Sequence, residues 1–407
     1  MGLSFGLGLP AAPKKGVGVS LIPFMAGQSD GFWYDFSKTD RLFQENVGPT
    51  PAATANVVIG LALSQRLWAG QTLAQVVASQ TPTLQDDFSS YADTAAMVAA
   101  GWDKRAATSG TVTLSSGAFQ FTSAAAGLSS GAGKLVSGFT VGRCYQLTGR
   151  IRMVSGGGSV SLGLRNSDGG GGSSMVIAAP SVAGTSFEQV TAYWVATQTT
   201  AHVALIPSVA AATAELDDIR ISDVSRYPAT QSAAGFKPKY QTTGAVFDAS
   251  DDNLLTSYVA QNGANFIVAY LDVPASIPAT QVVAGASGSS ANRCFLAFNT
   301  SGQLCAGVGS QSTTTVVGTT DWRGQTVVVG LSLDGSTVKL FAGSAEEYTA
   351  AQAGTPTTSI PFRVGALNNN GTAGSFSGVA MKRLLVGRQA LTLTQFNSIR
   401  SQLLAGA

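Results

Sequence analysis

Few side chains in this 407-residue sequence have the types and spacing that catalysis requires. The single histidine, His202, lies in an alternating segment in which Val203 and Leu205 take the opposite face. A Ser-His-Asp triad would need this imidazole as its base, but the pattern favours a solvent-facing strand residue. There is also no histidine pair and no CxxC pair for a zinc site. We therefore expect a protein that is not an enzyme.

The acidic residues offer no catalytic pair either. A glycosidase needs two carboxylates placed on either side of the scissile bond. Asp251 and Asp252 are interpreted as a turn and strand-edge motif rather than as a metal site. The glutamates that could have supplied such a pair lie in no recognisable motif: Glu188, Glu215, Glu346 and Glu347. A glycan hydrolase is thus the least favoured function.

Aromatic side chains are the better candidates for function, because sugar binding uses exposed rings that stack on pyranose faces. Trp102, Tyr145, Tyr193 and Trp194 are the candidates in the middle of the chain. Tyr193 and Trp194 are neighbours on an expected strand, so one of them should face outward. The alternative is that most of these residues belong to the core.

A second aromatic cluster lies near the N-terminus. Residues 31–35 read GFWYD, and Phe32, Trp33 and Tyr34 could anchor this region in a partner protein. Packing within the chain would explain the cluster equally well.

The elements that must position these residues are predicted to be strands. Segments 149–155, 159–165 and 201–205 alternate between apolar and polar residues, and glycine-rich stretches separate them. Strands at 266–273, 293–298, 303–308, 326–333 and 337–341 follow, with hairpins at 299–302 and at Asp334–Gly335. The sequence predicts an all-β protein with an arm and attachment region at 1–80 and two β-sandwiches at 81–225 and 226–407.

Three short helices interrupt this pattern. Thr72 with Gln75, and Thr392 with Gln395, form capping boxes before helices at 73–79 and near the C-terminus. The last helix has Leu393, Phe396, Ile399 and Leu403 on one face, and Arg400 suits its final turn. A third helix is expected from Ser37 to Phe43.

Composition limits the classes of partner. Only 11% of the residues are charged and the net charge is +2, so the counterion release that drives nucleic-acid binding has no evident source. We expect no membrane span, because no apolar run reaches about 18 residues. We expect no secretion signal either, because Lys14 and Lys15 follow the apolar start instead of preceding it. Cys294 and Cys305 could share one face of a hairpin and Cys144 stands alone, so free buried thiols are expected.

The C-terminal segment resembles the concanavalin-A-like, laminin-G-like jelly rolls. Residues 245–255 (AVFDASDDNLL) are similar to a motif near the start of that family, although Ala249 and Asn253 replace its usual Gly and Tyr. Trp322 with the following strand, and residues 362–378 with the closing helix, resemble later parts of the family pattern. The resemblance implies a jelly roll.

The middle segment resembles a jelly roll of the carbohydrate-binding-module type. Residues 86–90 (DDFSS) with 101–102 (GW) resemble the start of that family, and residues 215–221 (ELDDIRI) resemble its last strand. In such modules, acidic residues at these two places hold a structural calcium ion. The resemblance assigns that role to Asp87 and to Asp217 or Asp218, although two carboxylates do not establish a calcium site.

Residues 31–51 resemble a segment of tailed-phage structural proteins, through GFWYDFS, LFQ and GPTP. In those proteins the segment leads into a stretch similar to residues 237–255, which begin KPKYQ. The middle jelly roll therefore looks inserted between two halves of one arrangement.

This resemblance implies a virion-surface protein: a fibre, spike or decoration component that adheres to bacterial surface glycans. Its partners would be capsid or tail proteins, attached through Phe32, Trp33 and Tyr34, a host glycan, and further copies of the chain. We expect no cofactor apart from the structural calcium. A secreted cellular lectin is the alternative.

Overall fold

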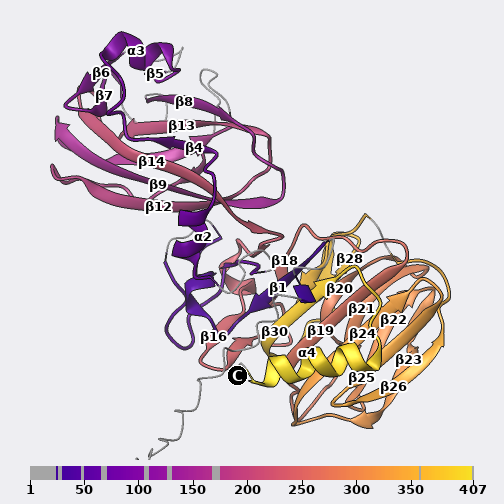
Figure 1. The fold of residues 1–407 in the computed structure, drawn as a ribbon. Helices are drawn as coiled ribbons and strands as arrows, with labels where there is room; N and C mark the ends of the chain where they lie inside the picture. The colour runs from indigo at the N-terminus through magenta and orange to yellow at the C-terminus, as the bar shows by residue number, and fades with distance from the viewer. Residues whose placement is uncertain are drawn as a thin grey trace, which may run out of the picture.

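The computed structural model describes residues 24–25, 30–46, 50–65, 71–104, 110–125, 131–166, 175–356 and 359–405. In these ranges the chain folds into two lobes, each built from facing β-sheets (Figure 1). This confirms the all-β class and the two sandwiches. Of the arm and attachment region expected at 1–80, residues 1–23, 26–29, 47–49 and 66–70 lie outside the described residues. Within the described ranges, no helix is long and apolar enough to cross a bilayer.

The middle lobe is a sandwich of a six-stranded and a five-stranded sheet. The larger sheet has the order β12-β9-β14-β7-β6, with β4 also paired to β14. Residues that face inward from both sheets, such as Phe119, Leu162 and Leu216, form the core of this sandwich. The bounds of the larger sheet are β4 (Leu84–Asp86), β6 (Gly110–Ser115), β7 (Ala118–Ser123), β9 (Arg143–Ser155), β12 (Glu188–Val195) and β14 (Thr213–Arg226). Those of the smaller are β5 (Asp103–Lys104), β8 (Ala132–Ser137), β10 (Val160–Arg165), β11 (Met175–Ala178) and β13 (Thr200–Pro207).

The second lobe is a larger sandwich. Its eight-stranded sheet has the order β16-β17-β30-β19-β24-β25-β26, and β1 also pairs with β30. Its strands are β1 (Gly31–Asp35), β16 (Lys239–Gln241), β17 (Gly244–Val246), β19 (Ala264–Asp272), β24 (Thr326–Asp334), β25 (Thr337–Ala342), β26 (Ala345–Ala351) and β30 (Ala380–Gly387). The facing eleven-stranded sheet has β2 (Leu42–Phe43), β3 (Leu61–Ala62), β15 (Ala229–Thr230), β18 (Leu254–Leu255), β20 (Gln281–Ser289), β21 (Asn292–Phe298), β22 (Gln303–Gly309), β23 (Gln311–Asp321), β27 (Arg363–Val364), β28 (Leu367–Asn369) and β29 (Thr372–Gly374).

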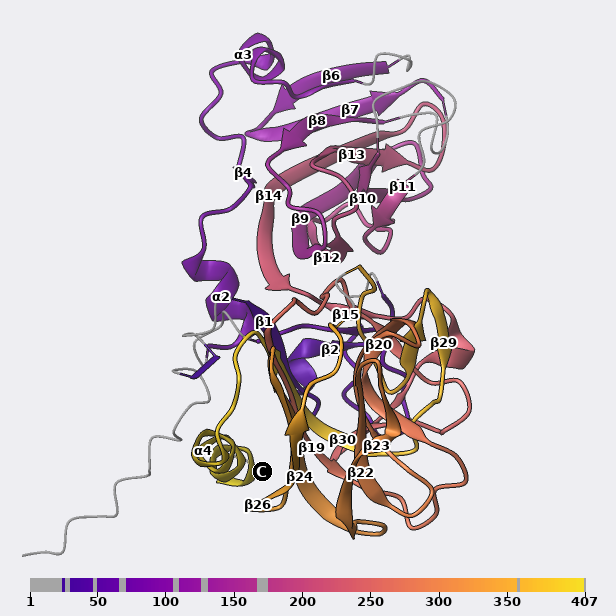
Figure 2. The same ribbon diagram turned by 90° about the vertical axis from the view of Figure 1, so that its right-hand side faces the viewer.

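Two α-helices have the predicted capping boxes. The backbone N–H of Gln75 donates to Thr72 Oγ1 at the start of α2 (Leu73–Ser79), and Gln395 does the same to Thr392 at α4 (Leu393–Ala405). Figure 2 shows α4 on the outer side of the sheet that contains β19 and β24. Phe396, Ile399 and Leu403 are buried there, so the predicted apolar face is confirmed. Short helices elsewhere in the described ranges include α3 (Thr94–Ala99) and the 3-10 turns η1 (Thr39–Arg41) and η3 (Ala234–Phe236).

The expected helix from Ser37 to Phe43 is reduced to one 3-10 turn. Lys38 stands at its start without a side-chain cap, and Leu42 and Phe43 already belong to strand β2. A single uncapped turn does not offset the cost of helix nucleation, and strand pairing with β3 takes over.

Residues 31–46 and 50–62 do not stand apart as an N-terminal region but belong to the second lobe. β1 pairs with β30 over residues 383–387, and β17 pairs with the same strand over residues 380–381. Backbone bonds between residues 56–59 and 238–240 join the two segments directly. The second lobe is therefore one sandwich built from both ends of the chain, and the middle sandwich is inserted between these ends. A separate N-terminal region that ends at residue 80 does not match this arrangement.

A buried cluster connects the two lobes. Phe43, Leu61 and Leu63 come from the second lobe, and Val76 comes from α2. The middle sandwich contributes Cys144, Tyr193 and Val224. We call these seven residues the joint cluster.

Candidate functional site

The four aromatic residues expected to bind sugar are buried. Trp102 is completely covered, and its Nε1 donates to Asp86 Oδ2 over 2.7 Å inside the middle lobe. Tyr145 and Trp194 both pack edge-on against Phe139 in the same core. The prediction that these rings face a ligand is therefore wrong, and the alternative of core packing holds.

Tyr193 points outward, as one of the two neighbours had to, yet it is only 3% exposed. Its ring lies 4.5 Å from the ring of Phe43, between centroids, in the joint cluster. Gln146 Nε2 donates to its hydroxyl over 2.9 Å. The second lobe thus covers the face on which Tyr193 was expected to meet solvent.

The aromatic residues assigned to virion attachment are also part of the fold. Phe32 and Tyr34 are fully buried between the sheets of the second lobe. Trp33 faces the other way and packs with the residues under α4. Because these side chains alternate across a paired strand, they stabilise the second lobe and are not available to a partner.

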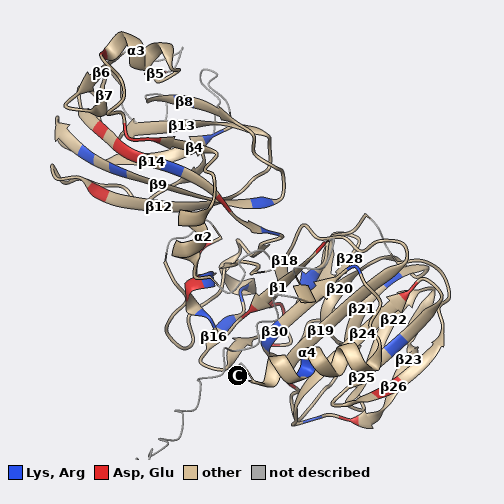
Figure 3. Cartoon of the chain, viewed as in Figure 1, with Lys and Arg blue, Asp and Glu red and all other residues tan. Residues whose placement is uncertain are grey.

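The acidic residues assigned to calcium are engaged by the protein itself. Arg150 Nη1 lies 3.2 Å from Asp217 Oδ2 and 3.0 Å from Asp218 Oδ2. Burial, followed by the charge of Asp218, raises the pKa of Asp217. Asp87 accepts from the backbone and hydroxyl of Ser89. An arginine between two of the carboxylates does not fit a calcium site, because a calcium ion there would have to displace Arg150 from Asp217 and Asp218. Figure 3 shows the basic residues of β9 beside the acidic residues of β14.

A different acidic trio brings its oxygens together. One carboxylate oxygen from each of Asp248, Asp251 and Asp252 lies within 4.8 Å of the others. Asp248 Oδ1 accepts the backbone N–H of Ser250, Asp251 and Asp252, which is the predicted turn motif. Burial, followed by the charge of Asp248, raises the pKa of Asp252 to about 7. The trio forms a turn and carries no further assignment.

His202 lines a hollow of about 300 Å³ on the outer face of the five-stranded sheet. Val203 and Leu205 face the core, as the alternation predicted. Asp103, Lys104 and Arg165 also line this hollow. It has no Phe, Tyr or Trp among its described lining residues, so it lacks a ring on which a sugar could stack.

A hollow of about 400 Å³ in the second lobe does contain such a ring. It lies between α4 and strands β24 to β26, where Trp322, Glu347 and Arg400 line it together with hydroxyl groups from Thr320, Thr326 and Ser344. We call it the Trp322 hollow. It combines an indole, a carboxylate, a guanidinium and hydroxyls, and this is the mixture that binds polar ring-shaped molecules.

Trp322 is half-buried and packs against the edge of the core. Its Nε1 donates to Glu347 Oε1 over 3.1 Å. The second carboxylate oxygen, Oε2, accepts the backbone N–H of Thr320 over 3.4 Å. Gly343 leaves room for the ring, because a Cβ there would lie 3.1 Å from the indole and its φ is +58°. Indole and carboxylate therefore hold each other in place at one side of the hollow.

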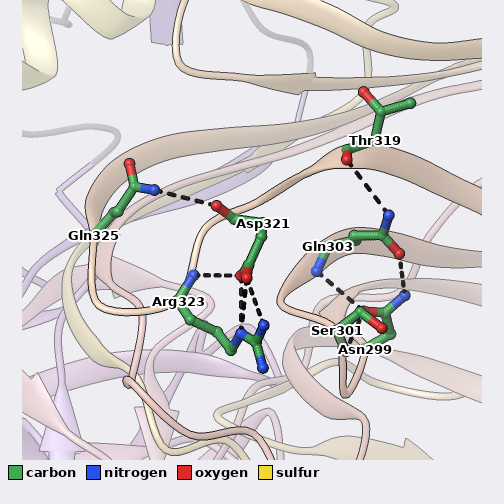
Figure 4. A network of polar contacts seen from close by, with 7 residues as sticks. All are labelled: Asn299, Ser301, Gln303, Thr319, Asp321, Arg323 and Gln325. Atoms are coloured by element: carbon green, nitrogen blue, oxygen red, sulfur yellow. Dashed lines mark hydrogen bonds and ion pairs between the residues drawn. The ribbon is translucent and has the colours of Figure 1, made fainter.

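A polar network fixes the loop that carries Trp322 (Figure 4). Arg323 donates to both carboxylate oxygens of Asp321, and Gln325 Nε2 donates to the Asp321 carbonyl over 3.1 Å. In the neighbouring turn Asn299 and Gln303 bind each other, and Gln303 reaches the Thr319 carbonyl. The N–H of Trp322 itself donates to the Gly302 carbonyl over 3.0 Å. The ring is thus presented on a loop whose backbone is held from both sides.

The position of α4 places Arg400 at the hollow. Phe396 stacks on Phe341 of β25 at 4.9 Å between ring centroids, and Asn397 Nδ2 donates to the Ser344 carbonyl over 3.2 Å. Arg400 follows Phe396 by four residues, so both lie on neighbouring turns of one helix face. The sequence alone separates Trp322, Glu347 and Arg400 by up to 78 residues, and it gave no sign that a β-turn and a terminal helix would bring them together.

No protein-family model matches the chain, and no curated protein matches it in sequence. Solved structures that match include carbohydrate-binding modules and sialidases. The CBM22-1 xylan-binding domain of Paenibacillus barcinonensis Xyn10C is 18% identical, covers 36% of this chain and 96% of its own, and has a TM-score of 0.28. The Ruminococcus gnavus IT-sialidase CBM40 bound to α2,3 sialyllactose is 18% identical over 35% of this chain and 83% of its own, with a TM-score of 0.29. Trypanosoma rangeli sialidase is 15% identical, and the match covers 45% of this chain and 31% of the sialidase with a TM-score of 0.34.

Proposed function

We propose that this chain is a non-catalytic protein that binds a glycan in the Trp322 hollow and displays this site on the surface of a tailed-phage virion. The observation that carries the binding function is the hollow itself. An indole, a carboxylate and a guanidinium from three separate elements converge on a space of about 400 Å³.

Sugars match these groups because a pyranose has apolar C–H faces and a rim of hydroxyls. The face can stack on the Trp322 indole, while hydroxyls donate to Glu347 and accept from Arg400. The loop network and the Trp322–Glu347 bond hold the ring before any ligand arrives, which lowers the entropy cost of binding.

The groups that line the Trp322 hollow favour sugar binding over sugar hydrolysis. A glycosidase would need a second carboxylate about 5–10 Å from the first. Among the described residues that line the hollow, Glu347 is the sole carboxylate, and both of its oxygens already accept N–H groups. We keep a glycan hydrolase as the least favoured alternative and a cellular lectin as the second.

The virion assignment depends on the resemblance of residues 31–51 and 237–255 to segments of tailed-phage proteins. Strands β1 and β17, from these two segments, lie along the same strand β30, so the halves that the resemblance joins are neighbours in space. Attachment to capsid or tail proteins and assembly into homo-oligomers are parts of this proposal. Neighbouring capsid or tail genes would support it, whereas a polysaccharide-utilisation gene cluster would contradict it.

A glycan array followed by calorimetric titration tests the binding function. We expect the wild-type chain to bind at least one bacterial surface glycan and the Trp322→Ala variant to bind it at least tenfold more weakly. Phe236→Ala removes another exposed ring, which does not line the hollow, and serves as the matched control. Equal loss in both variants, or no change in either, would contradict the assignment.

A further inference from the structure

Arg400 is the cation of the Trp322 hollow, and its guanidinium has no partner among the described residues. In the described part of the chain its guanidinium makes no hydrogen bond or ion pair. Every other described arginine has an interaction partner within the protein. Because a half-buried guanidinium has lost part of its hydration, an unpaired one at the wall of a hollow is a donor available to a ligand.

A role in helix stability does not explain this residue. The sequence placed Arg400 in the last turn of the final helix, where it would complement the helix dipole, but α4 continues to Ala405. The dipole effect fades outside the last turn. Arg400 is also the only charged residue between Leu393 and Ala405, so it has no acidic partner one turn away on its helix.

The negative charge in the hollow does not neutralise Arg400 directly. No ion pair joins Arg400 to Glu347, and the two carboxylate oxygens of Glu347 accept from Trp322 Nε1 and from the Thr320 backbone. Of the two charged groups that line the hollow, the Arg400 guanidinium is therefore the one without a partner in the described part of the chain, whereas both carboxylate oxygens of Glu347 already accept hydrogen bonds.

From this we infer, on the basis of the glycan-binding function proposed above, that the ligand is an acidic sugar whose anionic group pairs with Arg400 while its ring stacks on Trp322. A guanidinium binds a carboxylate or a sulfate through two parallel N–H···O bonds. A neutral sugar would leave some of these guanidinium N–H donors without an anionic acceptor. Uronic acids and sulfated hexoses share the required chemistry.

Calorimetric titration with three methyl glycosides tests the inference: methyl glucuronide, methyl glucoside and methyl glucoside 6-sulfate. We expect the wild-type chain to bind at least one anionic glycoside about tenfold more tightly than the neutral one. Comparison of methyl glucuronide with methyl glucoside 6-sulfate then shows whether the site prefers a carboxylate or a sulfate. Arg400→Gln should remove this preference, and Arg400→Lys should retain part of it because it keeps the charge without the fork. Lys38→Gln, which removes an exposed cation elsewhere, should change nothing.

The outcomes separate this inference from the function on which it rests. If the neutral glycoside binds as tightly as the anionic ones, with Trp322→Ala still weakening it, the acidic-sugar inference is wrong and glycan binding stands. If Arg400→Gln leaves the anionic preference intact, Arg400 is not the partner and the inference is also wrong. If neither these glycosides nor any arrayed glycan depends on Trp322, the proposed function falls as well.

Discussion

Replacing Tyr193 with alanine should uncouple the two lobes. The ring is 3% exposed and packs at 4.5 Å, between centroids, on Phe43 across the joint cluster. Removing a buried aromatic ring costs about 3–5 kcal/mol, from lost burial and from the cavity left behind. Phe43 of the second lobe contacts the outer side of this ring, so the loss should fall on the contact between the lobes.

Differential scanning calorimetry measures this effect. We expect the wild-type chain to unfold in one transition and Tyr193→Ala to separate the two lobes into distinct transitions. Tyr193→Phe is the matched control, because it keeps the ring and removes only the hydroxyl that accepts from Gln146 Nε2, at a cost of about 1 kcal/mol. A single transition in Tyr193→Ala, with a free energy of unfolding within about 1 kcal/mol of wild type, would contradict the claim that Tyr193 holds the two lobes together.

Three further predictions concern groups away from the hollow. The pKa of Asp252 is raised to about 7 in the folded chain, so the folded state binds one more proton than the unfolded state between about pH 4 and 7. The free energy of unfolding should therefore fall as pH rises through that window, by at most about 1.4 kcal/mol per pH unit. In denaturant titrations Asp252→Asn should reduce this pH dependence, and an unchanged pH dependence would contradict its assignment to Asp252. Chelation with EDTA should leave the melting temperature unchanged, because Arg150 already binds the acidic pair in the middle sandwich; a large drop would instead favour the calcium prediction. Cys144, Cys294 and Cys305 are buried and unpaired, and burial raises the pKa of each thiol, so Ellman's reagent should label them only after denaturation.

Local sequence rules were sufficient for the elements they govern. The hairpin at Asp334–Gly335 and the capped helices at Thr72 and Thr392 are present, because turn chemistry and capping act over a few residues. Cys294 and Cys305 show the limit of pattern alone. The strand register places Cys294 toward the sandwich core and Cys305 on the other face of the sheet, so the two residues do not share a face.

The site could not be predicted because it depends on packing between distant segments. Alternation correctly set Tyr193 and Trp194 on opposite faces, but it could not reveal that Phe43, 150 residues away, covers the outer one. In the same way Trp322 was recognised only as part of a fold pattern, and Glu347 and Arg400 had no local motif. The apposition of β26 and α4 gives these residues a shared hollow.

The most direct test of glycan binding in the Trp322 hollow is an NMR titration that follows the indole N–H resonances of the five tryptophans. Trp322→Phe assigns the relevant resonance. We predict that a glycan bound by the chain shifts the Trp322 resonance, because its Nε1–H lies at the hollow against Glu347, while the resonance of buried Trp102 stays in place. An unchanged Trp322 resonance at saturating glycan would contradict it.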